Sequence, residues 1–138
     1  MKTTSTINWK GNLREGNGTL TTQSGTLNKT PYNFKVRFEE NHKGTNPEEL
    51  LASAHGGCFT MSVAAELTKK GFTATSLDTE ATVTLKDLSI TGIHVSITGA
   101  VPNISSEEFK SIVEEARQNC IISRALNVPI TADAVLVV

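Results

Sequence analysis

The segment from Asn46 to Gly71, NPEELLASAHGGCFTMSVAAELTKKG, constrains the fold more than any other part of the chain. Asn46 suits a helix N-cap, Pro47 suits the first helical position, and Glu49 stands where a capping box places its acidic residue. Gly71 suits a left-handed C-cap. The segment therefore predicts one helix of about 24 residues, roughly 36 Å long at 1.5 Å per residue.

The predicted helix carries Cys58, one of 2 cysteines in the chain. Its apolar residues recur at helical spacing, and we expect them to face inward: Leu50, Ala54, Cys58, Met61 and Ala65, widened by Leu51, Phe59 and Val63. Gly56 and Gly57 each cost roughly 1 kcal/mol relative to Ala in mid-helix, so we expect a second helix or a substrate to approach them closely. The helix dipole acts only in the terminal turns, so it does little to lower the pKa of Cys58 in mid-helix. A reactive Cys58 therefore needs a nearby cation. The alternative is that Cys58 is a buried, inert thiol.

Length and charge exclude several classes of protein. A chain of 138 residues fits a single domain over 1–138 that folds without disulfides. The net charge of −1 and the pI of about 6.3 give no basic surface for nucleic acid or anionic membrane. The start, MKTTSTINWKG, lacks the apolar core of a signal peptide, and no apolar run reaches the roughly 18 residues of a membrane span. We expect a cytoplasmic protein whose cysteines are free or redox-active rather than permanently bridged.

The region before the helix reads as strands and glycine-rich turns. Strands are predicted over 4–9, 19–24, 26–28 and 32–39. In the last of these, alternation places Tyr32, Phe34, Val36 and Phe38 on a buried face. The same alternation places Arg37 on the polar face, in solvent.

The region after the helix reads as two strands, a helix and a strand. The strands over 79–85 and 93–99 form a hairpin through 86–92, and the last strand covers 130–138. Ser105 caps the second helix, whose apolar stripe is Phe109, Ile112, Val113, Ala116 and Cys120. The order predicts an α+β fold in which antiparallel β-sheets pack around two central helices.

Two inward cysteines on two packed helices permit redox chemistry at sulfur. Helix packing could bring their Cα atoms to the roughly 5.5 Å that a disulfide needs. In a peroxidatic pair, one thiolate attacks a peroxide and becomes a sulfenic acid, which the second thiol captures as a disulfide. Such a pair needs a cation at the thiolate and a carboxylate that fixes the cation. The arginines available are Arg14, Arg37, Arg117 and Arg124.

Several segments resemble one known family. NPEELLASAHGGCFTMSVA is similar to the segment around the reactive cysteine of the OsmC/Ohr family of organic hydroperoxide reductases, and QNCIISRAL is similar to its second-cysteine segment. WKGNLREGNGTLTTQSGTLN, YNFKVRFEE and KGTNPEEL resemble the OsmC branch more than the Ohr branch. The resemblance covers most of the chain.

The resemblance implies roles for four residues and a quaternary structure. Cys58 matches the peroxidatic cysteine and Cys120 the resolving cysteine. Arg37 matches the arginine that pairs with the reactive sulfur, and Glu48 matches the glutamate that orients this arginine. The family fold implies an intertwined homodimer with two active sites built from both chains. Arg37 would then face the other subunit rather than solvent.

The resemblance also implies the substrate and the reductant. Apolar lining from Phe38, Phe59, Met61 and Ile121 would favour organic hydroperoxides over hydrogen peroxide. A lipoyl-type dithiol is the implied reductant, and no metal, haem or flavin is required. The family usually has proline where Ile121 stands, which affects the local geometry of the second cysteine. Arg14, in a glycine-flanked loop, is an alternative to Arg37.

Three other hypotheses about function remain open from the sequence alone. His55 and Cys58 stand at i, i+3 and could contribute to a metal site, although the chain has no C-x-x-C or H-x-x-x-H pair. A Cys-His hydrolase would use Cys58 with His55, His42 or His94 as base, and has no use for Cys120. A non-enzymatic stress-associated or small-molecule-binding module would keep both cysteines as structural thiols.

Overall fold

The computed structural model describes residues 1–39 and 43–137. The chain divides into two compact units, residues 1–50 and residues 51–138. The expectation of a single domain over 1–138 stays a prediction.

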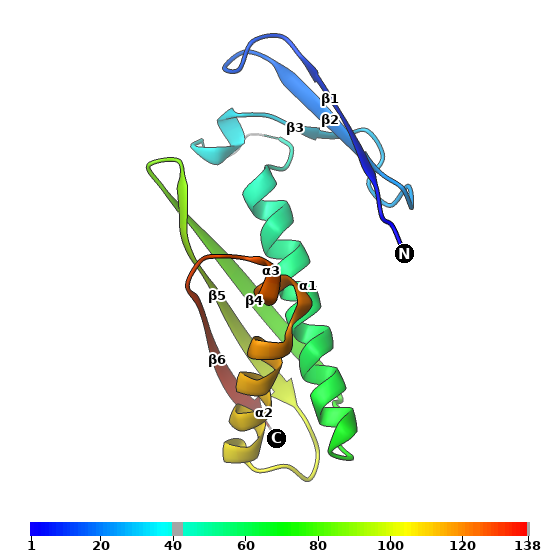
Figure 1. Cartoon of the computed structure of the whole chain (residues 1–138), viewed down its shortest axis with the longest axis vertical. Coiled ribbons are helices and arrows are strands. Elements are labelled where there is room, and N and C mark those ends of the chain that lie inside the picture. Colours follow the sequence, from blue (N-terminus) through cyan, green and yellow to red (C-terminus); the bar gives the residue numbers. More distant parts are fainter. Residues whose placement is uncertain (40–42, 138) are drawn as a thin grey trace. The chain divides into compact units, whose positions relative to one another are not determined.

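The first unit is built on a small antiparallel sheet with the strand order β1-β2-β3. The sheet consists of β1 (Ser5–Lys10), β2 (Asn17–Thr22) and β3 (Thr30–Tyr32), drawn in blue to cyan in Figure 1. The first two predicted strands are confirmed with ends shifted by up to two residues. The strand predicted over 26–28 is wrong, because those residues form bends before β3.

The strand predicted over 32–39 is also wrong beyond its first residue. The chain leaves β3 and forms a short 3-10 helix, η1 (Lys35–Arg37). The Asn33 side chain explains the change, because its Oδ1 accepts a hydrogen bond from the Val36 N–H at 3.0 Å and closes a helical turn. The turn brings the rings of Phe34 and Phe38 into edge contact, with centroids 5.1 Å apart. Their spacing therefore reflects a helical turn rather than one face of a strand.

The long helix α1 (Pro47–Lys69) has the predicted ends. The Glu49 N–H donates to Asn46 Oδ1 at 2.8 Å, which confirms the N-cap. At the other end Gly71 has a φ of +85°, and the Phe72 N–H donates to the Leu67 carbonyl, as in a Schellman motif.

The second unit contains a three-stranded sheet with the order β4-β5-β6. β4 (Ser76–Lys86) and β5 (Ser89–Ala100) form the predicted antiparallel hairpin. The predicted connection over 86–92 is wrong, because the strands extend further and the turn consists of Asp87 and Leu88. β6 (Ile130–Val137) pairs with β5 in parallel, because α2 (Ser106–Asn119) and α3 (Ile121–Ala125) carry the chain back before the last strand. The α+β fold class is confirmed, and the sheets are antiparallel except at this one pairing.

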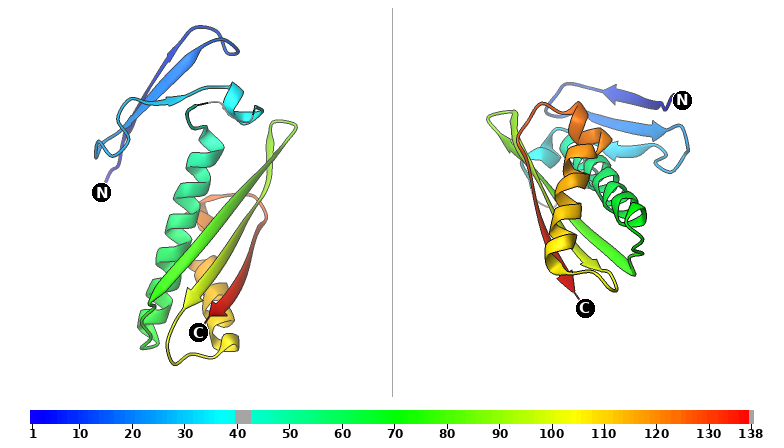
Figure 2. Two further views of the ribbon diagram at one scale, coloured as in Figure 1. Left: turned by 180° about the vertical axis from the view of Figure 1, so that it is seen from behind. Right: turned by 60° about the horizontal axis from the view of Figure 1, so that its bottom comes forward.

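Both α1 and α2 pack on the same face of the β4-β5-β6 sheet, as two views show (Figures 1 and 2). One cluster of buried side chains joins the three elements, and its largest members are Phe59, Phe109, Leu67, Ile97 and Ile112. The Ser105 hydroxyl accepts from the Glu108 N–H at 3.1 Å, so the predicted cap of the second helix is confirmed. No helix within the described ranges is long and apolar enough to span a bilayer.

The buried face of α1 differs from the predicted stripe. The buried residues are His55, Gly56, Phe59, Val63, Glu66 and Leu67. The predicted inward residues Ala54, Met61 and Ala65 are exposed, and Met61 keeps 74% of its accessible surface. The helix carries apolar residues around more than one side, and packing on the sheet selected one of them.

The two glycines before Cys58 have different surroundings. A Cβ on Gly56 would lie 3.2 Å from the Cβ of Ala81 in β4, so a strand rather than a helix approaches this backbone. A Cβ on Gly57 would meet no atom of the chain within 4 Å. The expected close approach is therefore confirmed at Gly56 only.

Candidate active site

The second unit brings the two predicted reactive sulfurs together. Cys58 lies half-buried in α1, and Cys120 is 1% exposed between α2 and α3; both thiols are free. Both belong to one packed cluster of side chains, in which Cys58 packs against the buried core that includes Cys120. The Ser62 hydroxyl, one helical turn beyond Cys58, donates to the Ala116 carbonyl at 3.1 Å and ties α1 to α2 beside the pair.

The first turn of α3 follows Cys120 directly, and the first N–H groups of a helix have no partner within it. Backbone N–H groups act to lower the pKa of both thiols, those of Ile122 and Ile121 at Cys58 and those of Ser123 and Ile122 at Cys120. Proline at position 121 would lack one of these N–H groups.

The pKa values of the two thiols move in opposite directions. Burial raises the pKa of Cys58 above its ordinary value, and the N–H groups of Ile122 and Ile121 offset this only in part. Burial also acts to raise the pKa of Cys120, but the Ser123 N–H and hydroxyl outweigh it, and the pKa of Cys120 is lowered. A positive group placed near Cys58 would lower its pKa and favour its thiolate.

A buried histidine on α1 contacts Ser123, three residues after Cys120. His55 is 0% exposed, and its Nε2 lies 2.7 Å from the Ser123 Oγ. Burial lowers the pKa of His55, so its imidazole is neutral. Sequence reasoning considered His55 as a metal ligand or a hydrolase base and did not pair it with Ser123; the position of Ser123 three residues after Cys120, in the first turn of α3, was the available signal.

The other candidate bases do not join this group. His94 lies on β5, where its ring nitrogens contact Thr131 Oγ1 at 2.6 Å and Asp133 Oδ2 at 3.0 Å. His42 lies outside the described residues. In the part of the chain that the structure describes, no group of three or more His, Cys, Asp and Glu side chains is arranged to hold a metal ion.

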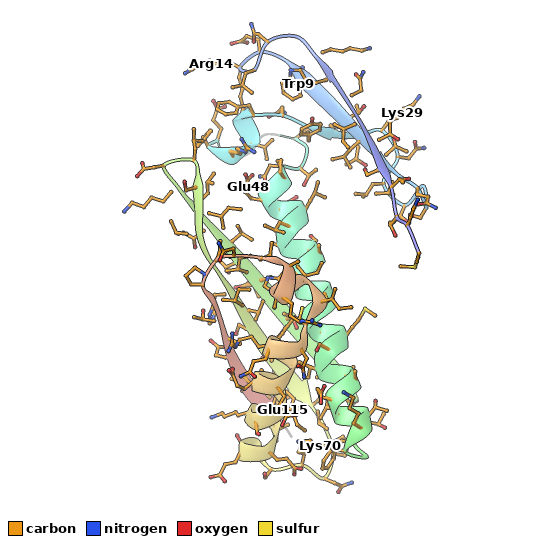
Figure 3. All side chains as sticks on the ribbon, in the orientation of Figure 1. Trp9, Arg14, Lys29, Glu48, Lys70 and Glu115 are labelled. Atoms are coloured by element: carbon orange, nitrogen blue, oxygen red, sulfur yellow. The ribbon has the colours of Figure 1, made fainter. Side chains whose placement is uncertain are left out.

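The first unit joins the predicted cation to its predicted carboxylate. Arg37 Nη2 lies 3.1 Å from Glu48 Oε1, and Arg37 Nε lies 3.1 Å from Glu48 Oε2. This two-point contact fixes the plane of the guanidinium. The side chains of Arg37 and Glu48 are 27% and 17% exposed, so the expectation from alternation that Arg37 points into solvent is wrong. Arg14 lies exposed in the turn between β1 and β2 (Figure 3).

An aromatic pocket of about 280 Å³ opens beside Arg37 in the same unit. It is lined by Trp9, Leu13, Tyr32, Asn33, Phe34, Arg37 and Pro47. The rings of Trp9 and Tyr32 lie 5.5 Å apart over Gly18, where any side chain would overlap Tyr32. Sequence reasoning missed this pocket, because its walls come from β1, β3 and η1, and only folding brings these together.

The residues predicted to line the substrate site occupy different environments. Phe59 has no exposed surface and packs in the core, so it does not line an open pocket within this chain. Phe38, Met61 and Ile121 are large apolar side chains that remain exposed. Their role at a substrate stays a prediction.

Comparison with known proteins identifies relatives over nearly the whole chain. Residues 40–133 match the family described as OsmC-like protein. The chain is 43% identical over 129 residues to "Peroxiredoxin OsmC" of Escherichia coli strain K12, covering 91% of this chain and 90% of the relative. It is equally similar to "Peroxiredoxin OsmC" of Shigella flexneri.

Solved structures share the fold at lower identity. An OsmC-like protein of unknown function from Vibrio cholerae matches with a TM-score of 0.80 at 14% identity, covering 98% of this chain and 99% of that one. An OsmC-like protein from Mycoplasma pneumoniae matches with a TM-score of 0.78 at 18% identity, covering 100% and 99%. The organic hydroperoxide resistance protein OhrB of Bacillus subtilis matches with a TM-score of 0.69 at 20% identity, covering 97% and 98%.

Proposed function

The chain belongs to the OsmC-like protein family, and on that basis we propose that it is a thiol-dependent peroxidase that reduces organic hydroperoxides to alcohols. Relatives at 43% identity are named peroxiredoxins, and a structural neighbour is named an organic hydroperoxide resistance protein. The observation that carries the proposal is that Cys58 packs against the same buried cluster that contains Cys120, with both thiols free.

The proposed cycle has three steps. The Cys58 thiolate attacks the terminal oxygen of the hydroperoxide, the O–O bond breaks, and the alkoxide takes up a proton to leave as alcohol. The Cys120 thiolate then attacks the Cys58 sulfenic acid, and hydroxide leaves and becomes water. An external dithiol, which we propose to be of the lipoyl type, reduces the Cys58–Cys120 disulfide and is itself oxidised.

Arg37 is the proposed cation for the first step. Cys58 needs a positive group because burial raises its pKa within its own unit. Arg37 is permanently charged, and Glu48 holds its guanidinium at two points, so it is suited to stabilising both a thiolate and a departing alkoxide. Arg37 also lies 6.0 Å from the Phe34 ring centroid, which restricts it further.

The aromatic pocket is the proposed site for the organic part of the substrate. Its walls carry Trp9, Tyr32 and Phe34, and Arg37 supplies the polar group at its edge. An apolar pocket with one charged group favours a hydroperoxide that has a hydrophobic tail. Phe38, Met61 and Ile121 remain proposed contacts of the substrate.

We also propose that the protein acts as a homodimer in the cytoplasm. The large exposed side chains of Met61 and Ile121 lie on the two segments that carry the reactive cysteines. Ala54 and Ala65 lie on the same unpartnered side of α1 as Met61. A second copy of the chain would remove this apolar surface from water.

Thiol titration with one equivalent of an alkyl hydroperoxide tests the peroxidase. We expect the loss of both thiols, a mass decrease of two hydrogens, and a Cys58–Cys120 bridge in the peptide map. Cys120→Ser should lose one thiol, accumulate sulfenic acid that dimedone traps, and fail to turn over with dithiol. Unchanged thiols in the wild-type protein would instead support the alternative, a module whose buried cysteines are structural.

A further inference from the structure

We infer that Asn33 is a positioning residue for Arg37, because its side chain closes the turn that presents the guanidinium to Glu48. The inference rests on the proposed role of Arg37 as the cation of the peroxidase. Asn33 acts through the backbone of residues 34–37, which lie with it in the first unit. It therefore affects the oxidation of Cys58 and not the closing of the disulfide.

The Asn33 side chain satisfies the first N–H group of a very short turn. η1 (Lys35–Arg37) has three residues, and its Arg37 N–H donates to the Phe34 carbonyl at 3.2 Å. The Val36 N–H, one position earlier, donates to Asn33 Oδ1 at 3.0 Å. A helix of this length has little stability of its own, so one side-chain hydrogen bond is a large part of what holds it.

The same contact caps two longer helices of this chain. Asn46 Oδ1 accepts from the Glu49 N–H at 2.8 Å. The Ser105 Oγ accepts from the Glu108 N–H at 3.1 Å. In each case the acceptor stands three positions before the donor, as it does at Asn33. Asn33 therefore acts as a cap, and serine is a suitable replacement for asparagine in this role.

The turn decides which side chains lie beside Arg37. Side chains three positions apart eclipse one another in a 3-10 helix, whereas in a strand they point to opposite faces. Phe34 and Arg37 have this separation, and Arg37 Cζ lies 6.0 Å from the Phe34 ring centroid. The two-point contact of Arg37 with Glu48, at 3.1 Å for both nitrogens, also requires one orientation of the guanidinium plane. Both contacts of Arg37 therefore depend on the turn.

Loss of the cap would favour the extended conformation that alternation predicts for this segment. Phe34, Val36 and Phe38 are all residues that favour strands, and the Asn33 side chain competes with that preference through its backbone hydrogen bond. The edge contact between the rings of Phe34 and Phe38 still favours the turn, so the loss is partial. Arg37 would then leave Glu48 for part of the time.

A double-mutant cycle tests whether Asn33 acts through Arg37. Asn33→Ala should slow the oxidation of Cys58 by an alkyl hydroperoxide roughly three- to thirtyfold, the range that loss of one helix cap produces. In the Arg37→Gln background it should change the rate by less than about twofold, because no guanidinium is left to hold. Asn33→Ser keeps an acceptor and should restore most of the rate. Equal slowing by Asn33→Ala in both backgrounds would overturn the inference.

The matched control is Asn12→Ala in the same unit. It removes a cap of the same spacing, in which Asn12 Oδ1 accepts from the Glu15 N–H at 2.7 Å, and it should oxidise at the wild-type rate. A wild-type rate in Asn33→Ala would overturn the inference and leave the peroxidase standing. Equal slowing in Asn12→Ala and Asn33→Ala would overturn it too, because the effect would then belong to the unit as a whole.

Nuclear magnetic resonance of the Arg37 Nε–H gives a readout that does not depend on activity. This N–H donates to Glu48 Oε2 at 3.1 Å, so its exchange with water should be slow in the wild-type protein, and the signal is assigned by its loss in Arg37→Gln. Asn33→Ala should speed the exchange severalfold, and Asn33→Ser should not. Unchanged exchange in Asn33→Ala would overturn the inference. A wild-type protein that does not react with hydroperoxide would refute the peroxidase alone, and the exchange rates would still decide the role of Asn33.

Discussion

The two units of the chain differ in how they use their apolar side chains. In the second unit, α1, α2 and the β4-β5-β6 sheet enclose a continuous core in which residues such as Phe59 and Phe109 have no exposed surface. Among the described residues of the first unit, Leu20 is the single hydrophobic side chain that is buried. Its aromatic rings line an open pocket instead. The second unit is therefore stabilised by burial, and the first unit presents apolar surface for binding.

The same contrast applies to the reactive groups. The second unit packs both cysteines against one buried cluster, and burial there raises the pKa of Cys58. The first unit carries the positively charged Arg37, which an ion pair with Glu48 holds in place. The cysteines and the held cation thus lie in different units of the chain.

The largest expected effect is on the core. Phe109→Ala should lower the free energy of unfolding by about 3–5 kcal/mol, because the ring is fully buried against Gly99 and leaves a cavity when it is removed. Urea denaturation measures the change. Trp9→Ala in the first unit is the matched large-to-small control and should cost markedly less. Equal losses in the two variants would contradict the contrast between the units.

Arg37→Gln tests the proposed role of the Arg37 guanidinium charge. It should slow the oxidation of Cys58 by about 10²- to 10³-fold, the usual loss when one hydrogen-bond donor to a transition state is removed. Alkylation of Cys58 against pH measures the thiolate directly. Burial already raises the pKa of Cys58, and losing the cation should move the midpoint to still higher pH, so that reactivity falls most below that midpoint. Arg14→Gln is the control. The opposite result, a slow Arg14 variant and a normal Arg37 variant, would transfer the role to Arg14.

Glu48→Gln should have a smaller effect on the same step, a loss of roughly tenfold, or about 1.4 kcal/mol. The substitution keeps the size of the side chain and one acceptor but removes the charge that holds Arg37 at two points. Second-order rates with an alkyl hydroperoxide measure it, and Glu15→Gln, at an exposed position of the same unit, is the control. A loss as large as that of Arg37→Gln would show that Glu48 does more than hold the arginine.

The smallest expected effect is at Gly57. Gly57→Ala should raise the free energy of unfolding by up to about 1 kcal/mol, because the new methyl meets no atom within 4 Å and alanine favours the helix. Gly56→Ala should gain less or lose stability, since its Cβ would lie 3.2 Å from Ala81. Thermal unfolding and size-exclusion chromatography of both variants measure this. A less stable or dissociated Gly57→Ala protein would place a second chain against this side of α1.

The sequence by itself determined the features that depend on neighbours along the chain. Asn46 and Gly71 mark the ends of α1, because caps act through hydrogen bonds within a few residues. Alternation identified β4 and β5, since every second side chain of a half-buried strand faces the core. The segments around Cys58 and Cys120 were enough to predict the family, which the comparisons confirm.

The tertiary structure alone decided what depends on partners distant in the chain. α1 is apolar around more than one side, so only packing on the sheet selected the face that carries His55 and Phe59. His55 and Ser123 are 68 positions apart, and no spacing rule joins them until α3 folds back over α1. Local sequence patterns reflect interactions within one helix or strand. The site consists of contacts between helices and strands, and those contacts exist only once the core has formed.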